Sequence, residues 1–270
     1  MTKVILCEGC SWTAGDMINP ELKLAGEEHP YVNHPKNDDY RLPKVWPHKL
    51  GKKLGIDVLN KSVSGSSNDG IIRRTMREVK QLLLKYKPEE LFVIVGWTSP
   101  ERKDFYYTGE WEAWETMYPI SNYQSIPDED IDTFYQIYRE KFWNEQEYLE
   151  RYVQQNLLLH YFLKEHKVNH LFFDAFYETR GKDGLFNSFT IDEVISYEMK
   201  KSPQSHSLIK YFLGIRNEFC LEESFRNVIL NDFSKLIGNY AHPNEEAHEI
   251  WSEYIFKKLK GKIDEVIQQK

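Results

Sequence analysis

Four short segments in the first two thirds of the chain are candidate strands, and those at 4–7 and 91–95 are continuous apolar runs. The four segments cover residues 4–7, 56–63, 91–95 and 169–173. Near-continuous apolar runs of this length are typical of strands in a parallel sheet whose two faces are both buried. The pattern therefore predicts four parallel strands.

Between these runs, apolar residues recur at spacings of three and four, which predicts amphipathic helices. One helix is expected from Asn68, as N-cap, to about Lys85, and one long helix over residues 130–165. A final helix is expected to begin near Asn244. Their predicted inward faces carry Ile72, Met76, Val79 and Leu83; Ile131, Phe134, Tyr138 and Phe142; and Ala247, Ile250, Trp251, Tyr254 and Ile255. Alternating strands and helices imply an α/β fold with a parallel sheet covered on both faces.

Three regions lack this periodicity and hold most of the prolines, namely residues 16–45, 100–128 and 175–230. They are expected to be long insertions over one end of the sheet. Since the sequence shows no repeat, linker or low-complexity tract, residues 1–270 are predicted to form one domain.

Composition and charge exclude several classes of protein. The net charge of −7 and pI near 5.8 do not favour a nucleic-acid-binding surface, which would need a basic face. Lys257, Lys258, Lys260 and Lys262 are interpreted as the solvated face of the last helix. No run approaches the roughly 20 apolar residues of a membrane-spanning helix, and no signal peptide is visible. We expect a soluble protein in the cytoplasm.

The three cysteines do not suggest a disulfide framework. Cys7 and Cys10 form a C-x-x-C pattern, but no second pair is present to complete a zinc site. We therefore expect no metal.

Candidate chemistry lies directly after the predicted strands, where ligand sites of open α/β sheets are found. Ser11 follows the first strand in a turn of small residues, and His242 lies on a predicted loop before the last helix. A hydroxyl becomes a good nucleophile when a nearby base takes its proton, and surrounding amides can hold a developing oxyanion. The alternatives are a serine that merely caps the next segment and a surface histidine. His248, within the last helix, is expected to be structural or on the surface.

Four segments, in order, carry a resemblance to a known family. Gly9–Gly15 resembles block I (G-D-S-x-x-x-G) of the SGNH (GDSL-type) hydrolases, and Ser64–Ser66 resembles block II. Gly96–Ser99 falls at block III (G-x-N-D), and Asn239–Pro243 is similar to block V (D-x-x-H-P).

The resemblance implies a flavodoxin-like three-layer α/β/α sandwich with about five parallel strands. It also implies Ser11 as nucleophile, His242 as base, and the amides of Ser11 and Gly65 as oxyanion donors. Members of this family hydrolyse esters of lipids, acetylated sugars and small acyl compounds without a metal or organic cofactor.

The chain departs from the family pattern at three positions. Cys10 replaces the block I aspartate, Thr98 replaces the block III asparagine, and Asn239 replaces the block V aspartate that orients the base. Losing one oxyanion donor costs on the order of a hundredfold in rate, and the corresponding Asp-to-Asn change in serine proteases costs roughly 10⁴-fold. Asn68 is a candidate replacement donor. For the missing block V aspartate two alternatives are open, a Ser-His dyad that works without an acid and Asp232 as a replacement acid.

A second resemblance concerns Gly96–Arg102, which is similar to a stretch in SGNH-like proteins of tailed bacteriophages. It implies a phage product carried in the virion or in the host cytoplasm. An aromatic segment follows, which suits sugar stacking, a protein interface or packing on its own domain. Its members are Tyr106, Tyr107, Trp111, Trp114, Tyr118 and Tyr123.

Two main hypotheses follow. The first is a serine esterase or deacetylase acting on a small-molecule or carbohydrate ester. The second is a non-catalytic phage structural or host-surface-binding protein with a degenerate site and virion proteins as partners. A nucleotide-binding enzyme is disfavoured because the chain lacks G-x-x-x-x-G-K-[ST] and G-x-G-x-x-G motifs. The sequence does not indicate an oligomeric state.

Overall fold

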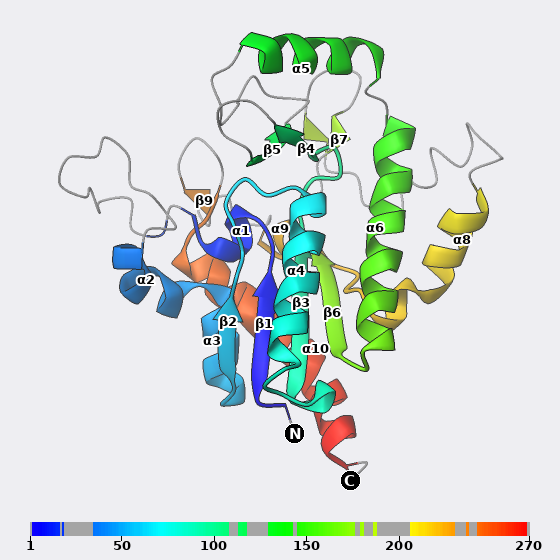
Figure 1. Ribbon diagram of the computed structural model, residues 1–270. Helices are drawn as coiled ribbons and strands as arrows, with labels where there is room; N and C mark the ends of the chain where they lie inside the picture. The colour runs from blue at the N-terminus through cyan, green and yellow to red at the C-terminus, as the bar shows by residue number, and fades with distance from the viewer. Residues whose placement is uncertain are drawn as a thin grey trace.

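A four-stranded parallel sheet forms the centre of the computed structural model (Figure 1). The structure describes residues 2–16, 18, 35–107, 113–117, 129–142, 145–175, 179–180, 186–187, 206–229, 236–237 and 242–268. The strand order is β2-β1-β3-β6, and all three pairings are parallel. The strands are β1 (Val4–Glu8), β2 (Asp57–Asn60), β3 (Leu91–Trp97) and β6 (Asn169–Asp174).

A fifth position of the sheet is reduced to a single bridge outside β6. The Phe172 N–H donates to the Phe219 carbonyl at 2.7 Å, and the Leu221 N–H donates to the Phe172 carbonyl at 2.8 Å. These bonds place Cys220 parallel to β6. The expected sheet of about five strands is thus built from four strands and this bridge.

Helices cover both faces of the sheet, so the predicted three-layer α/β/α architecture is confirmed. In β1, Val4 and Leu6 face α4 (Asn68–Leu82) and α6 (Glu145–Glu165), because side chains alternate along a strand. Ile5 and Cys7 face the opposite layer, α3 (Trp46–Leu54) and α10 (Glu245–Gln268). Figure 1 shows these two layers in front of and behind the sheet.

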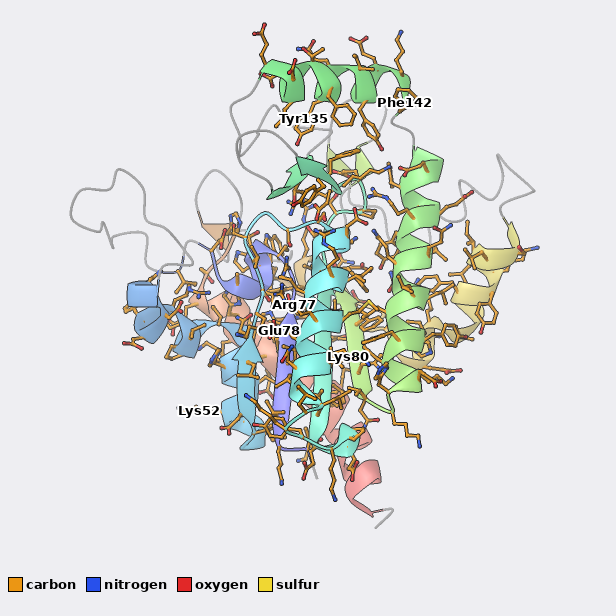
Figure 2. All side chains as sticks on the ribbon, viewed as in Figure 1. Lys52, Arg77, Glu78, Lys80, Tyr135 and Phe142 are labelled. Atoms are coloured by element: carbon orange, nitrogen blue, oxygen red, sulfur yellow. The ribbon has the colours of Figure 1, made fainter. Side chains whose placement is uncertain are left out.

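The predicted helix over residues 130–165 is wrong as a single element. The chain forms α5 (Glu129–Lys141) and then α6, and α5 packs on the hairpin of β4 (Lys103–Tyr107) and β5 (Ala113–Met117) instead of on the sheet. The apolar positions of α5 keep their helical spacing, but they face the hairpin: Ile131, Tyr135 and Tyr138 are buried against Phe105 of β4. Figure 2 shows Tyr135 directed from α5 toward the hairpin. Phe134 and Phe142 of the predicted inward face are 41% and 61% exposed.

Other boundaries also differ from the sequence prediction. β2 ends at Asn60 rather than at Val63, and β3 continues through Gly96 to Trp97. A Cβ on Gly96 would lie 2.7 Å from Phe173 Cζ, so this glycine reflects tight packing within the strand. The N-cap of α4 is Ser67, whose Oγ accepts from the Gly70 N–H at 3.0 Å, while Asn68 is the first helical residue.

The regions expected as insertions contain further short elements in their described parts. The helices are α2 (Pro35–Arg41), α8 (His206–Ile215) and α9 (Phe225–Ile229). 3-10 turns follow α2 at Leu42–Lys44 and α8 at Arg216–Glu218, and a third, outside these regions, precedes β3 at Pro88–Glu90. The strands are β7 (Thr179–Arg180) and β8 (Phe186–Asn187). Within the described residues, no helix is both long and apolar enough to cross a membrane.

The last helix matches its prediction closely. Ala247, Trp251 and Ile255 are fully buried, and the Trp251 ring stacks on Phe225 with centroids 5.0 Å apart. Lys257, Lys258 and Lys260 are exposed, as expected for a solvated face. His248 is structural: it is fully buried, and its Nδ1 accepts from the Trp46 N–H at 3.3 Å.

Burial of His248 predicts acid-sensitive stability. Burial lowers its pKa from 6.5 to about 3, so below pH 6.5 the unfolded chain binds a proton that the folded chain excludes. The contribution to the free energy of unfolding is present above pH 6.5 and falls by about 1.4 kcal/mol per pH unit on acidification toward pH 3. His248→Gln, which keeps an acceptor for Trp46, should flatten this dependence in urea unfolding between pH 4 and 7. His166→Gln is the control, and equal slopes in the two variants would contradict the assignment.

Candidate active site

Ser11 begins a four-residue helix, α1 (Ser11–Ala14), that starts directly beyond the carboxyl end of β1. Gly15 ends this helix with a left-handed backbone (φ +85°). The N–H groups of Gly15 and Asp16 both donate to the Ser11 carbonyl, at 2.8 and 3.0 Å. The turn therefore fixes the backbone around Ser11, whose side chain is buried but not wholly enclosed, at 6% exposure.

The Ser64-Gly65 turn lies beside this helix because the chain beyond β2 continues along β1. The Lys61 N–H donates to the Cys7 carbonyl at 2.9 Å, and the Val63 N–H donates to the Gly9 carbonyl at 3.2 Å. Gly65 then takes a left-handed conformation (φ +74°) that other residues rarely adopt. Block I and block II therefore meet at one edge of the sheet.

Thr98 and Asn68 are joined at the same edge. Asn68 Oδ1 accepts from the Thr98 N–H at 2.9 Å, and Asn68 Nδ2 donates to the Thr98 carbonyl at 3.2 Å. Both residues are almost fully buried, and Thr98 Oγ1 has no hydrogen-bond partner among the described residues. Asn68 thus ties the start of α4 to the end of β3, and this bond uses one of the two hydrogens of its amide.

His242 lies in β10 (His242–Pro243), which pairs antiparallel with β9 (Leu236–Ile237). The predicted loop position is therefore wrong, because the bridge to Ile237 holds this backbone in place. β10 contacts both α1 and α10, and Asn244 caps α10 by accepting from the Ala247 N–H at 2.9 Å. The His242 side chain is 15% exposed.

Asp16 is a site residue that the sequence analysis missed. Its Oδ2 accepts a hydrogen bond from the Ser64 hydroxyl and lies 4.0 Å from His242 Nε2. Asp16 therefore links the block I turn, the block II turn and the histidine. The available signal was its position directly after the last glycine of block I.

Burial and two arginines set the charges of this pair. Burial raises the pKa of Asp16 to about 6, although the Ser64 hydroxyl and the charges of Arg41 and Arg102 oppose the rise. Burial lowers the pKa of His242 to about 4, and the charge of Arg102 acts in the same direction. At pH 7 the contact is thus between a carboxylate and a neutral imidazole, which is free to accept a proton.

Some predicted residues fall elsewhere. Asn239 and Asp232, together with Trp111, Tyr118 and Tyr123, lie outside the described residues. Tyr106 is described and is 50% exposed on β4. Cys7 and Cys10 are buried free thiols. The described ranges contain no group of three or more His, Cys, Asp or Glu side chains that could hold a metal ion.

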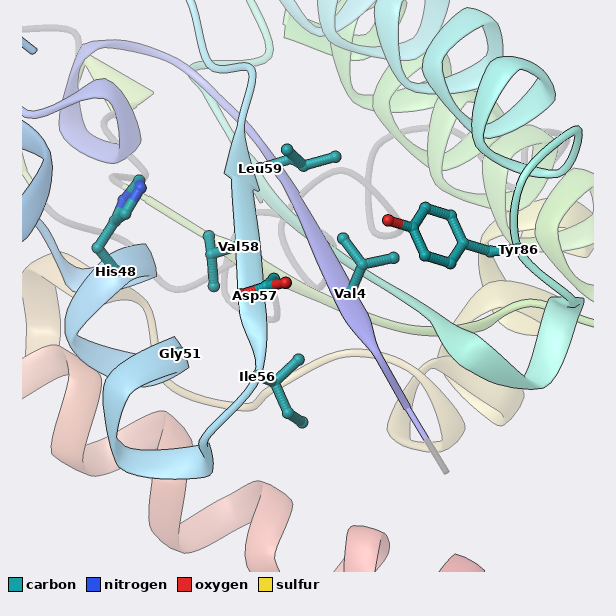
Figure 3. Close-up of a pocket in the computed structure, with 8 residues that line it drawn as sticks. All are labelled: Val4, His48, Gly51, Ile56, Asp57, Val58, Leu59 and Tyr86. Atoms are coloured by element: carbon teal, nitrogen blue, oxygen red, sulfur yellow. The ribbon is translucent and has the colours of Figure 1, made fainter.

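A cavity of about 450 Å³ lies along β2 and is separate from this site. Figure 3 shows it between Val4, His48, Asp57 and Tyr86. Val4 and Asp57 are the first residues of their strands. The cavity therefore lies toward the opposite end of the sheet from Ser11 and His242.

Comparison with known proteins places the chain in a family. Residues 29–195, more than half of the chain, match a family described as a family of unknown function (DUF6071). The chain belongs to this family. No curated protein matches this DUF6071 member in sequence.

Solved structures similar to this DUF6071 member include esterases and lipolytic proteins. A carbohydrate esterase family 2 enzyme with its carbohydrate-binding domain, from Corynascus thermopiles (Myceliophthora fergusii), is 12% identical over 98% of this chain and 67% of its own, with a TM-score of 0.52. The psychrotrophic esterase EstA from Pseudoalteromonas sp. is 14% identical over 97% of this chain and 99% of its own, with a TM-score of 0.48.

A member of the lipolytic protein G-D-S-L family from Veillonella parvula is 12% identical over 93% of this chain and 95% of its own, with a TM-score of 0.42. At such identities the similarity concerns the fold. The DUF6071 member has an SGNH-hydrolase-like fold, which confirms that part of the sequence prediction.

The bond between Asn68 and Thr98 yields a stability prediction. Asn68→Ala leaves the buried N–H and carbonyl of Thr98 without their partner, which costs roughly 1–3 kcal/mol per unsatisfied group. Asn68→Asp keeps the acceptor for the Thr98 N–H but places a carboxylate oxygen against the buried Thr98 carbonyl, so it should lose at least as much stability. Urea unfolding at pH 7 measures both variants, and an alanine variant as stable as the native chain would contradict the role of the bond.

Proposed function

We propose that this protein is a serine ester hydrolase in which Ser11 is the nucleophile and His242 is the general base. The observation that supports this most strongly is the packing of α1, which begins at Ser11, against β10, which carries the largely buried His242. Burial lowers the pKa of His242 to about 4, so its imidazole is neutral at pH 7. A neutral imidazole has the lone pair that a serine nucleophile requires.

The proposed reaction follows the usual two steps of acyl transfer. Ser11 Oγ attacks the ester carbonyl while His242 takes its proton, and the imidazolium then protonates the leaving alcohol. Water next attacks the acyl-enzyme with His242 again acting as base. The amides of Ser11 and Gly65 are the proposed oxyanion donors, with Thr98 Oγ1 and the second amide hydrogen of Asn68 as further candidates.

We further propose an acyl ester carried on a carbohydrate as the substrate class. The fold is similar to that of a carbohydrate esterase. The β4–β5 hairpin is anchored near the site, because the Asp104 N–H donates to Asp69 Oδ2 at 3.1 Å and Arg73 pairs with Asp104. This hairpin carries the half-exposed ring of Tyr106, and aromatic faces of this kind suit sugar stacking.

Covalent labelling tests the proposal. A fluorophosphonate probe should label the native chain, and Ser11→Ala should abolish labelling and reduce p-nitrophenyl acetate turnover by at least about a hundredfold, because the attacking oxygen is gone. Ser207→Ala, at an exposed serine on α8, is the control and should behave as the native chain.

Two results would contradict the proposal. One is labelling that persists in Ser11→Ala. The other is a folded native chain that neither reacts with the probe nor cleaves p-nitrophenyl acetate or acetylated sugars. The second result would favour the non-catalytic hypothesis, in which the protein is a phage structural or host-surface-binding protein.

A further inference from the structure

We propose that Asp16 positions His242 and stabilises its imidazolium, a role that the block V pattern assigns to residue 239. This inference rests on the proposed function and adds a positioning residue to it. Position 239 holds an asparagine, whose amide has no charge to offset an imidazolium. Asp16 brings a carboxylate to the same histidine from the opposite end of the sequence.

The backbone of Asp16 is fixed relative to the proposed nucleophile. Its N–H donates to the Ser11 carbonyl at 3.0 Å, and the preceding Gly15 is held in a left-handed conformation. A Cβ on Gly15 would lie 2.0 Å from Val45 Cγ1, so the turn is packed tightly against its neighbour. Asp16 and Ser11 are therefore held together by one tightly packed turn.

The side chain of Asp16 is aimed by the block II turn. The Ser64 hydroxyl donates to Oδ2, the oxygen that lies 4.0 Å from His242 Nε2. Both side chains are largely buried, at 9% and 15% exposure. This separation exceeds a hydrogen bond, but catalytic hydrogen bonds are often long without substrate and shorten in the reacting complex.

The two ring nitrogens of His242 then have separate roles, one toward Asp16 and one as the proton acceptor. Nε2–H faces the Asp16 carboxylate. Nδ1 is buried without a hydrogen-bond partner among the described residues, so in this tautomer it keeps the lone pair that accepts the proton of Ser11. The tautomer follows from the acceptor on the Nε2 side, as it does for other oriented histidines.

The surrounding charges make a carboxylate necessary here. Arg102 acts on both members of the pair, Arg41 acts on Asp16, and the buried His248 lies close enough to be affected by His242. These neighbours come from the segment after β3, from α2 and from α10. Arg102 is the cation that acts on His242, so an imidazolium at position 242 would face its positive charge without Asp16 to offset it.

The proposal predicts a shift in the pH dependence of kcat/KM for p-nitrophenyl acetate. The native chain requires ionised Asp16, so activity is lost as pH falls through about 6. In Asp16→Asn, activity should fall by roughly 10²–10⁴-fold. The remaining activity requires only neutral His242. The acid limb of the kcat/KM profile of Asp16→Asn, where activity falls with falling pH, should therefore move down to about pH 4. A residue that merely supports the fold would lower activity without moving this limb.

A second variant tests independently the direction in which the pKa of Asp16 moves the acid limb of the pH profile. The Ser64 hydroxyl holds the pKa of Asp16 down, so Ser64→Ala should move the acid limb above its native position. Asp57→Asn, at an exposed residue that begins β2, is the matched control and should leave rate and limb unchanged. A limb that stays near pH 6 in Asp16→Asn would overturn the proposal.

Imidazole NMR provides a readout that does not depend on turnover. With His242 assigned by comparison with His242→Gln, its ring resonances should show an inflection near pH 6 in the native chain and none there in Asp16→Asn. An inflection that persists in Asp16→Asn would overturn the contact. If Ser11→Ala abolishes turnover while Asp16→Asn turns over substrate like the native chain, the inference about Asp16 fails but the proposed function stands. If turnover survives in Ser11→Ala, the proposed function itself fails.

Discussion

Parallel pairing of β1 with β2 and β3 is the interaction on which the site depends. The register sets Cys7 opposite both Asn60 and Ile94, so the segments that follow the three strands leave the sheet together. The chain beyond β2 then bonds to the carbonyls of Cys7 and Gly9. Residues more than 50 positions apart thereby meet at one edge, as open α/β sheets require.

Desolvation is the second constraint, and it shifts the pKa values of the two titratable groups in opposite directions, upward for Asp16 and downward for His242. Burial favours the uncharged forms of both Asp16 and His242. The Ser64 hydroxyl and the arginines oppose the effect of burial on Asp16, while the charge of Arg102 adds to the effect of burial on the imidazole. The result is a base that is unprotonated near pH 7 beside a carboxylate. A solvated surface would not separate these roles so clearly.

Much of this architecture could be predicted from the sequence because strand burial and helix periodicity are local patterns. The four strands and the last helix were identified in this way, and the family resemblance indicated the fold. The split between α5 and α6 could not be found, since Ile131 and Tyr138 keep a helical phase whether they pack on a sheet or on a hairpin. The β9–β10 bridge depends on long-range pairing of only two residues per strand. Asp16 could not be found in this way because its contacts involve partners at positions 64 and 242.

The central claim is that Ser11, the Gly65 turn and His242 face a single reacting carbonyl. A crystal structure of the chain after treatment with a fluorophosphonate would test it most directly. We predict phosphorus bonded to Ser11 Oγ, its oxygen about 2.7–3.1 Å from the amide nitrogens of Ser11 and Gly65, and a ring nitrogen of His242 within hydrogen-bond reach of Ser11 Oγ. An unmodified Ser11 in a well-ordered structure, or an adduct with His242 turned away from it, would contradict the claim.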